Sequence, residues 1–286
     1  MCNSRMKRCI VVALLLGLAA CQTVLDPYGR PIEAPLQMPS GDVAGGGGTF
    51  SLITTQQEIE LGRQLAAEVE YQHHVDTDPQ LQAYVNGIGQ WLVANVTRRD
   101  IPYSFVVIDN PGSINSFSLP GGRTYVYTGL MKLASNEAEL AAVMAHEIAH
   151  LVLRHHAATI ARQYGFEMLT GIILGQNPDE KARLVADLVG AGVQARFSKD
   201  QERTADELGI QILASPGYNP EAMLSIFQKI GAAGQTTTNI PIFSSHPTTQ
   251  ERLQRFQVLL QTFPPNIRAD SPIYMERYQE QVLNKL

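Results

Sequence analysis

Apolar residues recur every three or four positions along several segments of the chain, and this spacing predicts amphipathic helices. One helix is expected from a cap at Thr55–Glu58 to about Gln72. A second begins at Asp78-Pro79, because a proline at the first helical position after an aspartate is a typical helix start. The apolar side of this second helix consists of Leu81, Tyr84, Val85, Ile88 and Leu92.

The pattern changes to runs typical of strands at residues 103–109 and 123–128, with a turn at 110–112 and a short extended piece at 115–119 between them. Helical spacing then dominates to the C-terminus. Two later apolar segments, 168–175 and 185–193, are far shorter than the ~20 residues that a membrane span needs. The interpretation as two core helices is favoured over a mobile lid or lipid-touching surface. The predicted fold is α+β, mostly helical, with a small sheet.

The most informative helix follows a cap at Ser135 or Asn136, with Glu139 placed for a capping box. Its buried side is marked by Leu140, Val143, Met144, Ile148 and Leu151. Among these apolar residues stand His146, Glu147 and His150. Burying three such polar side chains is costly unless something pairs with them, so the pattern indicates a site rather than a core helix with incidental histidines.

His146 and His150 are four residues apart and therefore project from one face of a helix, where both imidazoles reach one metal ion. Glu147 stands beside the first ligand, placed to take a proton from an attacking water. This is the His-Glu-x-x-His motif of zinc peptidases. It predicts one zinc ion per chain and peptide-bond hydrolysis.

Tetrahedral catalytic zinc needs one more protein ligand, and one candidate is His156. It lies ten residues after His146, as in the metzincin pattern. That pattern needs a glycine at position 153 to turn the chain out of the helix, and Leu153 stands there. The helix is therefore expected to continue, directing His156 away from the metal and His155 to the opposite face.

The other candidate is Glu202, on a new helix that Ser198 would cap. A glutamate from a second helix is the third ligand in the gluzincin arrangement. Asp206 is four residues further on the same face and could accept a hydrogen bond from the free N–H of a ligand imidazole. The alternative is a solvated charged helix start, since acidic residues favour the first turn. Beside a zinc motif that lacks one ligand, the metal-site interpretation is favoured.

Four stretches together resemble the HtpX-like zinc metallopeptidases, which are family forty-eight of the metallopeptidases. This family includes the CAAX prenyl endopeptidases, and the resemblance is to its lipid-anchored periplasmic members. The stretches are His146–His150, Phe197–Asp206, the strand pair from Asn115 to Leu130, and a late His-Pro segment, Ser244–Arg252. The resemblance covers roughly residues 55–262. It implies a gluzincin fold with a small sheet beside the active-site helix, a catalytic zinc with Glu202 as third ligand, and endopeptidase activity.

The late segment supplies candidate donors for the oxyanion that develops during hydrolysis, namely His246 and Arg252. His246 is expected in a loop before a helix capped at Thr248–Glu251. A loop histidine could instead bind zinc as a fourth ligand and hold the enzyme latent, or have no function. The peptide substrate is expected to add as a strand along Asn115, Ser116, Phe117 and Ser118.

The N-terminus predicts export. Residues 1–20 combine a basic start, a short apolar stretch and small residues, as in a signal peptide. Leu18–Cys21 resembles the bacterial lipobox, which implies cleavage before Cys21 and lipidation of its thiol and amino group. Cleavage near Ala20 at an ordinary secretory site is the alternative. The other cysteines, Cys2 and Cys9, would leave with the signal peptide, so Cys21 would have no disulfide partner.

Gln22, rather than an aspartate, follows Cys21, which in the usual sorting rule implies the outer membrane, facing the periplasm. Residues 21–54 are expected to form a flexible tether ahead of a metallopeptidase domain at 55–286. The tether is indicated by Pro27, Pro31, Pro35, Pro39 and Gly45–Gly48.

Charge narrows the possible partners. The whole chain has a net charge of −5, and loss of residues 1–20, with their Arg5, Lys7 and Arg8, makes it more negative. This negative charge argues against a nucleic-acid partner and against electrostatic adhesion to anionic lipid. Expected partners are protein or peptide substrates, above all unfolded envelope proteins, and the membrane through a lipid anchor.

The rival hypothesis is a chaperone-like outer-membrane assembly factor. Glu147 argues for catalysis, since a structural zinc site fills all four positions with protein ligands.

Overall fold

The computed structural model describes residues 53–174, 176, 178–179, 182–183, 197–236, 240–242, 246–247 and 249–286. The expected signal peptide, Cys21, nearly all of the tether, and the apolar segment 185–193 therefore lie outside the described residues. In the part of the chain that is described, no helix is both long and apolar enough to cross a bilayer.

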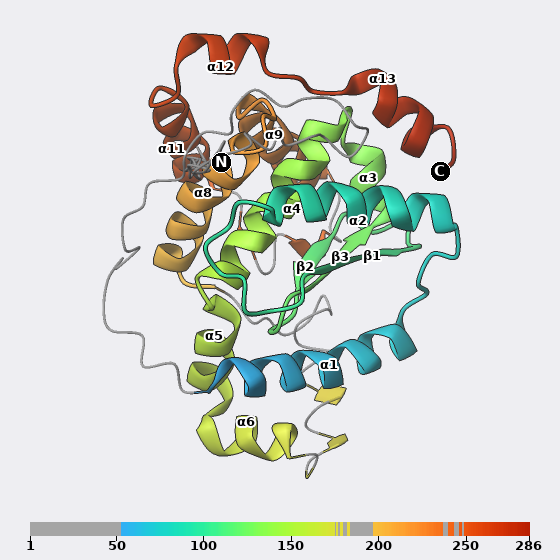
Figure 1. The fold of residues 1–286 in the computed structure, drawn as a ribbon, viewed down its shortest axis with the longest axis vertical. Coiled ribbons are helices and arrows are strands. Elements are labelled where there is room, and N and C mark those ends of the chain that lie inside the picture. Colours follow the sequence, from blue (N-terminus) through green and yellow to red (C-terminus); the bar gives the residue numbers. More distant parts are fainter. Residues whose placement is uncertain are drawn as a thin grey trace, which may run out of the picture.

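The described chain is mostly helical with a small sheet, which confirms the predicted fold class (Figure 1). Its strands are β1 (Ser104–Ile108), β2 (Ser116–Ser118) and β3 (Arg123–Tyr127). Its helices are α1 (Thr55–Gln72), α2 (Pro79–Val93), α3 (Thr128–Leu133), α4 (Glu137–Val152), α5 (His155–Tyr164), α6 (Phe166–Ile173), α8 (Lys199–Ala214), α9 (Glu221–Thr236), α11 (Gln250–Leu260), α12 (Pro265–Asp270) and α13 (Met275–Tyr278), followed by the π-helical turn η1 (Gln279–Leu283).

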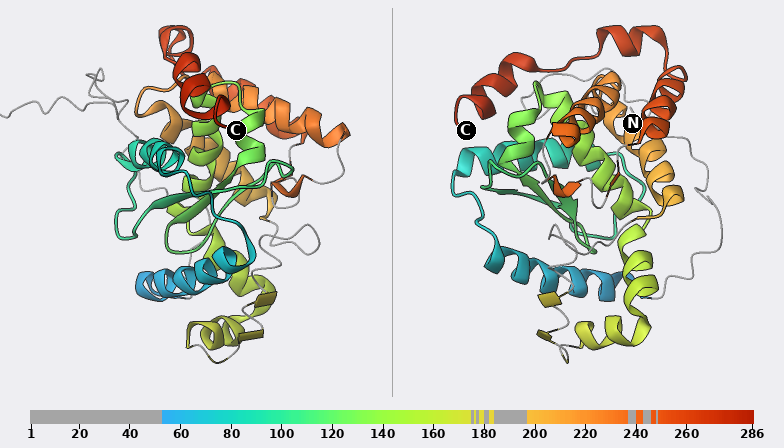
Figure 2. Two further views of the ribbon diagram at one scale, coloured as in Figure 1. Left: turned by 90° about the vertical axis from the view of Figure 1, so that its right-hand side faces the viewer. Right: turned by 180° about the vertical axis from the view of Figure 1, so that it is seen from behind.

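The sheet has the strand order β1-β3-β2, with β1 parallel and β2 antiparallel to β3. Helices α2 and α4 pack on one face, and α8 and α9 pack in turn against α4. Helix α1 covers the other face, where Phe117 and Tyr125 belong to a second core (Figure 1). The C-terminal helices α11, α12 and α13 cross the end of the molecule opposite α1 and α6 (Figures 1 and 2).

Helix α4 is the central element: every residue from Glu137 to Leu151 is buried. Polar contacts hold its N-terminal end, where the buried Glu137 carboxylate accepts hydrogen bonds from Tyr84, from the Tyr218 hydroxyl at 2.5 Å and from Arg277 Nε at 2.6 Å. A buried carboxylate with such partners is strongly fixed in place. The N-terminal end of the histidine-bearing helix is thus bound to α2, to the loop after α8 and to the C-terminal segment.

The C-terminal end of α4 corrects the sequence analysis. The prediction that this helix continues past position 153 is wrong: it ends at Val152, and Arg154 adopts a left-handed conformation with φ of 57° before α5 begins. The physical reason is tertiary. Glu58 of α1 lies 2.8 Å from Arg154 and 2.7 Å from Arg98, and Arg98 also donates to the Leu151 carbonyl at 2.6 Å. These buried contacts offset the cost of a left-handed arginine, which is about 1–3 kcal/mol.

Two predicted caps are displaced by one residue. Helix α1 is capped by Thr54, in a capping box with Gln57, rather than by Thr55. Helix α11 is capped by Thr249, which accepts from the Arg252 amide, so the box predicted from Thr248 is wrong. The Asn136 cap and the Ser198 cap are confirmed.

A glycine of α1 allows the close approach of the loop that leads to β3. A Cβ at Gly62 would lie 1.7 Å from the Pro120 carbonyl oxygen, so Gly62→Ala is expected to lower the free energy of unfolding by at least ~1–3 kcal/mol. A Cβ at Gly87 of α2 would meet no neighbouring atom within 4 Å. Gly87→Ala should therefore raise the free energy of unfolding by ~0.5–1 kcal/mol, because alanine has the higher helix propensity. Denaturant unfolding of both variants checks this, and equal effects would contradict the described packing.

Candidate metal centre

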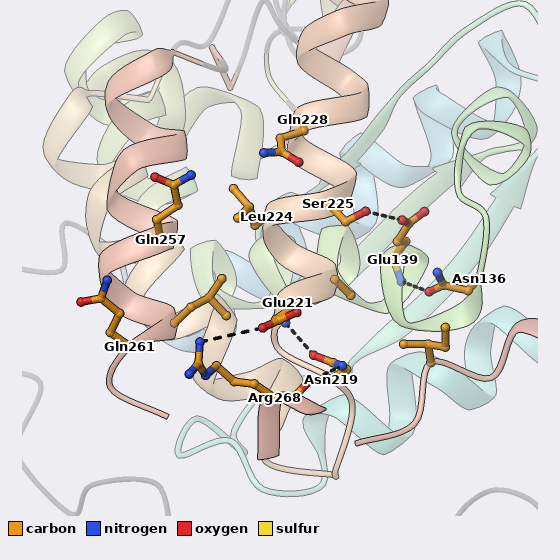
Figure 3. A pocket seen from close by; sticks show the side chains of 13 residues that line it. Asn136, Glu139, Asn219, Glu221, Leu224, Ser225, Gln228, Gln257, Gln261 and Arg268 are labelled. Atoms are coloured by element: carbon orange, nitrogen blue, oxygen red, sulfur yellow. Dashed lines mark hydrogen bonds and ion pairs between the residues drawn. The ribbon is translucent and has the colours of Figure 1, made fainter. Parts of the chain in front are cut away.

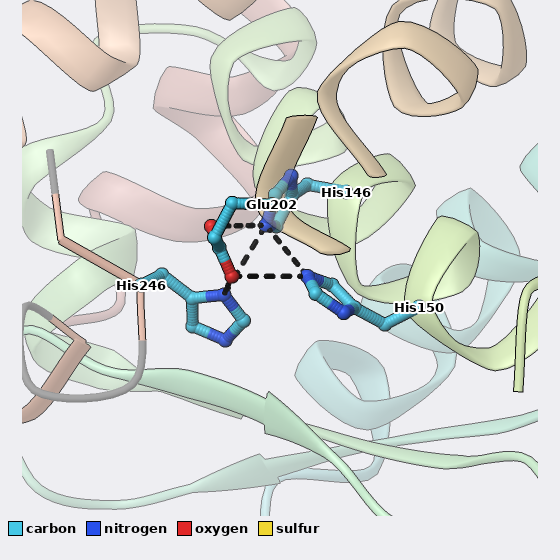
Figure 4. Close-up of side chains that lie close together, drawn as sticks. All are labelled: His146, His150, Glu202 and His246. Atoms are coloured by element: carbon cyan, nitrogen blue, oxygen red, sulfur yellow. Dashed lines mark hydrogen bonds and ion pairs between the residues drawn. The ribbon is translucent and has the colours of Figure 1, made fainter. Parts of the chain in front are cut away.

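Two helices bring the predicted metal ligands together. α4 supplies His146 and His150, and α8 supplies Glu202 (Figure 4). The helices pack closely because residue 209 of α8 is glycine: a Cβ there would lie 3.1 Å from His146 Cα. The candidate ligand atoms of these residues, and of His246, all lie within 4.8 Å of one another.

The metal-binding atoms point toward one another. The Nε2 atoms of His146 and His150 are 3.1 Å apart, and the Glu202 oxygens lie 3.5 Å and 3.4 Å from them. All three side chains are buried. Two imidazole nitrogens and one carboxylate oxygen, converging away from water, are a donor set that suits a metal ion such as zinc.

His246 approaches the same point from the loop before α11 (Figure 4). Its Nδ1 lies 2.9 Å from Glu202 Oε1 and 3.2 Å from His146 Nε2. Its Nε2 lies 3.3 Å from Glu147 Oε1. The histidine of the late His-Pro segment thus stands between the ligands and the proposed base.

Asp206 and Arg252 lie behind the ligands. Asp206 Oδ1 is 3.1 Å from His146 Nδ1, the ring nitrogen that faces away from the other ligands. Arg252 donates from Nε and Nη2 to the two Asp206 oxygens at 2.8 Å and 2.6 Å, and its Nη1 lies 2.7 Å from Glu202 Oε2. The guanidinium therefore holds two carboxylates in fixed relative positions.

The charges of this cluster shift the pKa values of the metal-free site. Burial lowers the pKa of His146, but hydrogen bonds to Asp206 and Glu202 outweigh it and raise this pKa to about 9. Burial raises the pKa of Glu202, yet the charges of His246 and Arg252 hold it well below its usual value. The Asp206 pKa is likewise lowered, by Arg252 and His146 against the effect of burial. Both carboxylates are therefore kept ionised, as ligand and orienting groups require.

The side chain of Glu147 points toward strand β2. Its Oε2 accepts a hydrogen bond from Ser118 Oγ at 2.8 Å. Strand β2 is the edge of the described sheet, and its flanking residue Asn115 is bound through its carbonyl to the Tyr127 amide at 3.1 Å. Phe117 stacks on Tyr125 in the core, with ring centroids 5.1 Å apart. Of the four residues 115–118, the structure thus brings the Ser118 side chain against the proposed base, whereas the Phe117 side chain faces away.

Two residues near the centre were placed wrongly by the sequence analysis. His155 Nδ1 lies 3.1 Å from His150 Nδ1, and His156 Nε2 lies 3.2 Å from Ser118 Oγ. Both were expected to point away, because the helix was expected to continue. The turn at Arg154 instead directs both rings toward the site. Neither supplies an atom to the cluster of candidate ligands, so the geometry favours the gluzincin set over the metzincin one.

A pocket of about 520 Å³ opens elsewhere, between the N-terminal end of α4 and helices α9 and α11 (Figure 3). Its wall includes Glu139, which accepts a hydrogen bond from Ser225 at 2.6 Å. Side-chain amides such as Gln257 also line it. It contains none of the candidate ligands.

Comparison with known proteins agrees with this geometry. The family model described as Peptidase family M48 matches residues 79–259. The chain belongs to this peptidase family. The resemblance inferred from the four sequence stretches is therefore confirmed, and the match spans both ligand-bearing helices as well as His246 and Arg252.

Several curated relatives carry protease names. A beta-barrel assembly-enhancing protease of Yersinia pestis is 30% identical over 274 residues, covering 92% of this chain and 56% of the relative. That of Escherichia coli K12 is 31% identical over 233 residues, covering 77% of this chain and 47% of the relative. A mitochondrial metalloendopeptidase OMA1 of Schizosaccharomyces pombe is 29% identical over 175 residues, covering 61% and 51%. The chain thus spans about half the length of the relatives it matches.

Proposed function

We propose that the chain is a zinc-dependent endopeptidase of the bacterial cell envelope that cleaves misfolded or unassembled envelope proteins. The observation that carries this is the convergence of His146, His150 and Glu202 in a buried cluster, with Glu147 held beside them by Ser118. The family match and the relatives' names support peptidase chemistry.

The residues have distinct proposed roles. His146, His150 and Glu202 would hold the zinc ion, which would supply a Lewis acid at this point of the site. Glu147 takes the proton of the attacking water and delivers it to the leaving amine. The hydroxyl of Ser118 fixes one oxygen of this carboxylate and leaves the other for proton transfer. Asp206 holds the ring of His146 in its ligating orientation.

His246 was expected either to stabilise an oxyanion or to bind zinc as a latch. The short distances from its Nδ1 to Glu202 and His146 favour the latch, in which His246 withdraws before substrate enters. Arg252 already donates to both Asp206 and Glu202. We therefore propose that it organises these carboxylates instead of serving as an oxyanion donor.

The substrate is proposed to bind as an extended strand along β2. Main-chain pairing with a sheet edge accepts many sequences, which suits a protease for unfolded proteins. Because Ser118 of β2 contacts Glu147, a peptide beside this strand would pass the proposed base. Ser116 would contribute through its backbone groups, whereas the Asn115 carbonyl is already bound to the Tyr127 amide of β3.

Metal removal tests the activity directly. Purified protein should contain about one zinc per chain, and a chelator should remove both the metal and the cleavage of casein or of an unfolded outer-membrane protein. Added zinc should restore cleavage. Full cleavage by protein shown to be metal-free would contradict the proposal.

The proposed address is the outer membrane, facing the periplasm, through a lipid on Cys21. Cys21→Ala is expected to abolish lipid labelling and to release the protein from membranes, because the lipid on Cys21 is the proposed anchor. Fractionation after labelling with a radioactive fatty acid checks this. Membrane association that persists without the lipid would point to the apolar segments around Ile172 and Val189.

A second candidate function is assembly assistance without extensive proteolysis. It is favoured by the names of the bacterial relatives, which describe enhancement of β-barrel assembly. Zinc would then be mainly structural. The Glu147 variant discussed below separates the two functions.

A further inference from the structure

We propose that His155 is a positioning residue that fixes the tautomer of His150 and so sets the affinity of the site for zinc. The inference rests on the proposed zinc site. The side chain reaches His150 only because α4 ends at Val152 and the chain turns at Arg154.

A metal-binding histidine needs a bare ring nitrogen toward the metal and a hydrogen on the other, which a neighbouring group accepts. For His146 that acceptor is the Asp206 carboxylate, 3.1 Å from Nδ1. No carboxylate lies in the same place for His150 among the contacts of the described residues. There the neighbour is His155, with the two Nδ1 atoms 3.1 Å apart. One of these nitrogens must carry the hydrogen, and the other must accept it.

Thr204 decides which nitrogen donates. Its hydroxyl has a single hydrogen, which it donates to carbonyls of its own helix, to Asp200 at 3.0 Å or Gln201 at 3.1 Å. Toward His155 Nε2, at 3.5 Å, it therefore presents a lone pair, and Nε2 carries the hydrogen of His155. The Nδ1 of His155 is then an acceptor, so His150 donates from Nδ1. Its Nε2 is left bare and faces Glu202 at 3.4 Å.

Packing holds this chain of contacts in place. His155 is buried, and its carbonyl accepts a hydrogen bond from Gln201 Nε2 at 3.3 Å. The ring of Phe197 lies over His150, with centroids 4.0 Å apart. A ring confined in this way has little freedom to rotate and present its other nitrogen to the metal position. Helix α8 thus supports both ligands of α4, one through Asp206 and the other through Thr204 and His155.

The test compares two substitutions at one position. Asparagine places its amide oxygen near the position of histidine Nδ1 and keeps an acceptor, whereas leucine fills the space without one. Zinc affinity, measured by competition with a chromophoric chelator, is expected to fall ~10–100-fold in His155→Leu and to stay close to the original value in His155→Asn. His156→Leu is the matched control, because His156 contacts Ser118 and no ligand nitrogen, and its zinc affinity should be unchanged.

The ring ¹⁵N shifts of His150 in the metal-free protein give a second measurement. They should report a hydrogen on Nδ1 in the original protein and in His155→Asn, and a mixture of tautomers in His155→Leu. Equal zinc affinity in His155→Leu and the original protein would overturn the inference, as would equal losses in His155→Leu and His156→Leu. If His155→Leu does not fold, Thr204→Val decides: a mixed His150 tautomer supports the inference, and an unchanged one overturns it. Failure of the original protein to bind zinc would instead overturn the proposed function.

Discussion

Replacing Glu147 with glutamine is expected to remove peptide-bond hydrolysis while leaving zinc bound. The change is nearly isosteric, and the carboxylate contacts Ser118 and His246 without belonging to the ligand cluster. The amide cannot take a proton from water. Loss of a general base costs ~10²–10⁴ in rate, and the effect should be at the upper end when the nucleophile is activated by a metal.

The assay pairs casein cleavage with zinc content on the same sample. Glu207→Gln is the matched control, because it makes the same chemical change on α8 at a side chain that pairs with Arg255 at the surface. It should keep nearly full activity. Undiminished cleavage by zinc-loaded Glu147→Gln would show that the mechanism is wrong. Undiminished biological complementation without cleavage would favour the assembly function.

Substitution of the third ligand should have the next largest effect. Glu202→Ala and His150→Ala are each expected to lose most of the bound zinc, because two remaining protein ligands do not hold a catalytic zinc. Glu202→Ala also leaves the buried Arg252 with one carboxylate fewer, which costs up to ~3–5 kcal/mol. Glu202→Gln retains the shape and separates zinc loss from this loss of stability.

Asp206→Asn provides the graded comparison. It leaves all ligand atoms in place but weakens the contact that orients His146 and one of the two hydrogen bonds from Arg252, so a smaller loss of affinity, ~10–100-fold, is expected. Zinc content by mass spectrometry and affinity by chelator competition measure both classes of variant. Full occupancy in Glu202→Ala together with zinc loss in His156→Ala would show that the gluzincin assignment is wrong.

The sequence by itself determined the local part of this site. Helical spacing places His146 and His150 on one face whatever surrounds the helix, and the structure has both within α4. The three strand segments and the Ser198 cap followed from equally local patterns. The choice of Glu202 needed more, because its partners are over fifty residues away; there the missing third ligand and the family resemblance supplied what periodicity could not.

Only the tertiary structure decided where α4 ends. Leucine and arginine at 153 and 154 give no local stop signal, and the turn exists because the buried Glu58 of α1 pairs with Arg154 while Arg98 binds the Leu151 carbonyl. That turn brings His155 to His150 and His156 to Ser118. Contacts between elements distant in sequence leave no periodic pattern in the sequence. The residues that surround the ligands are therefore placed by tertiary packing, whereas the ligands themselves could be predicted from the sequence.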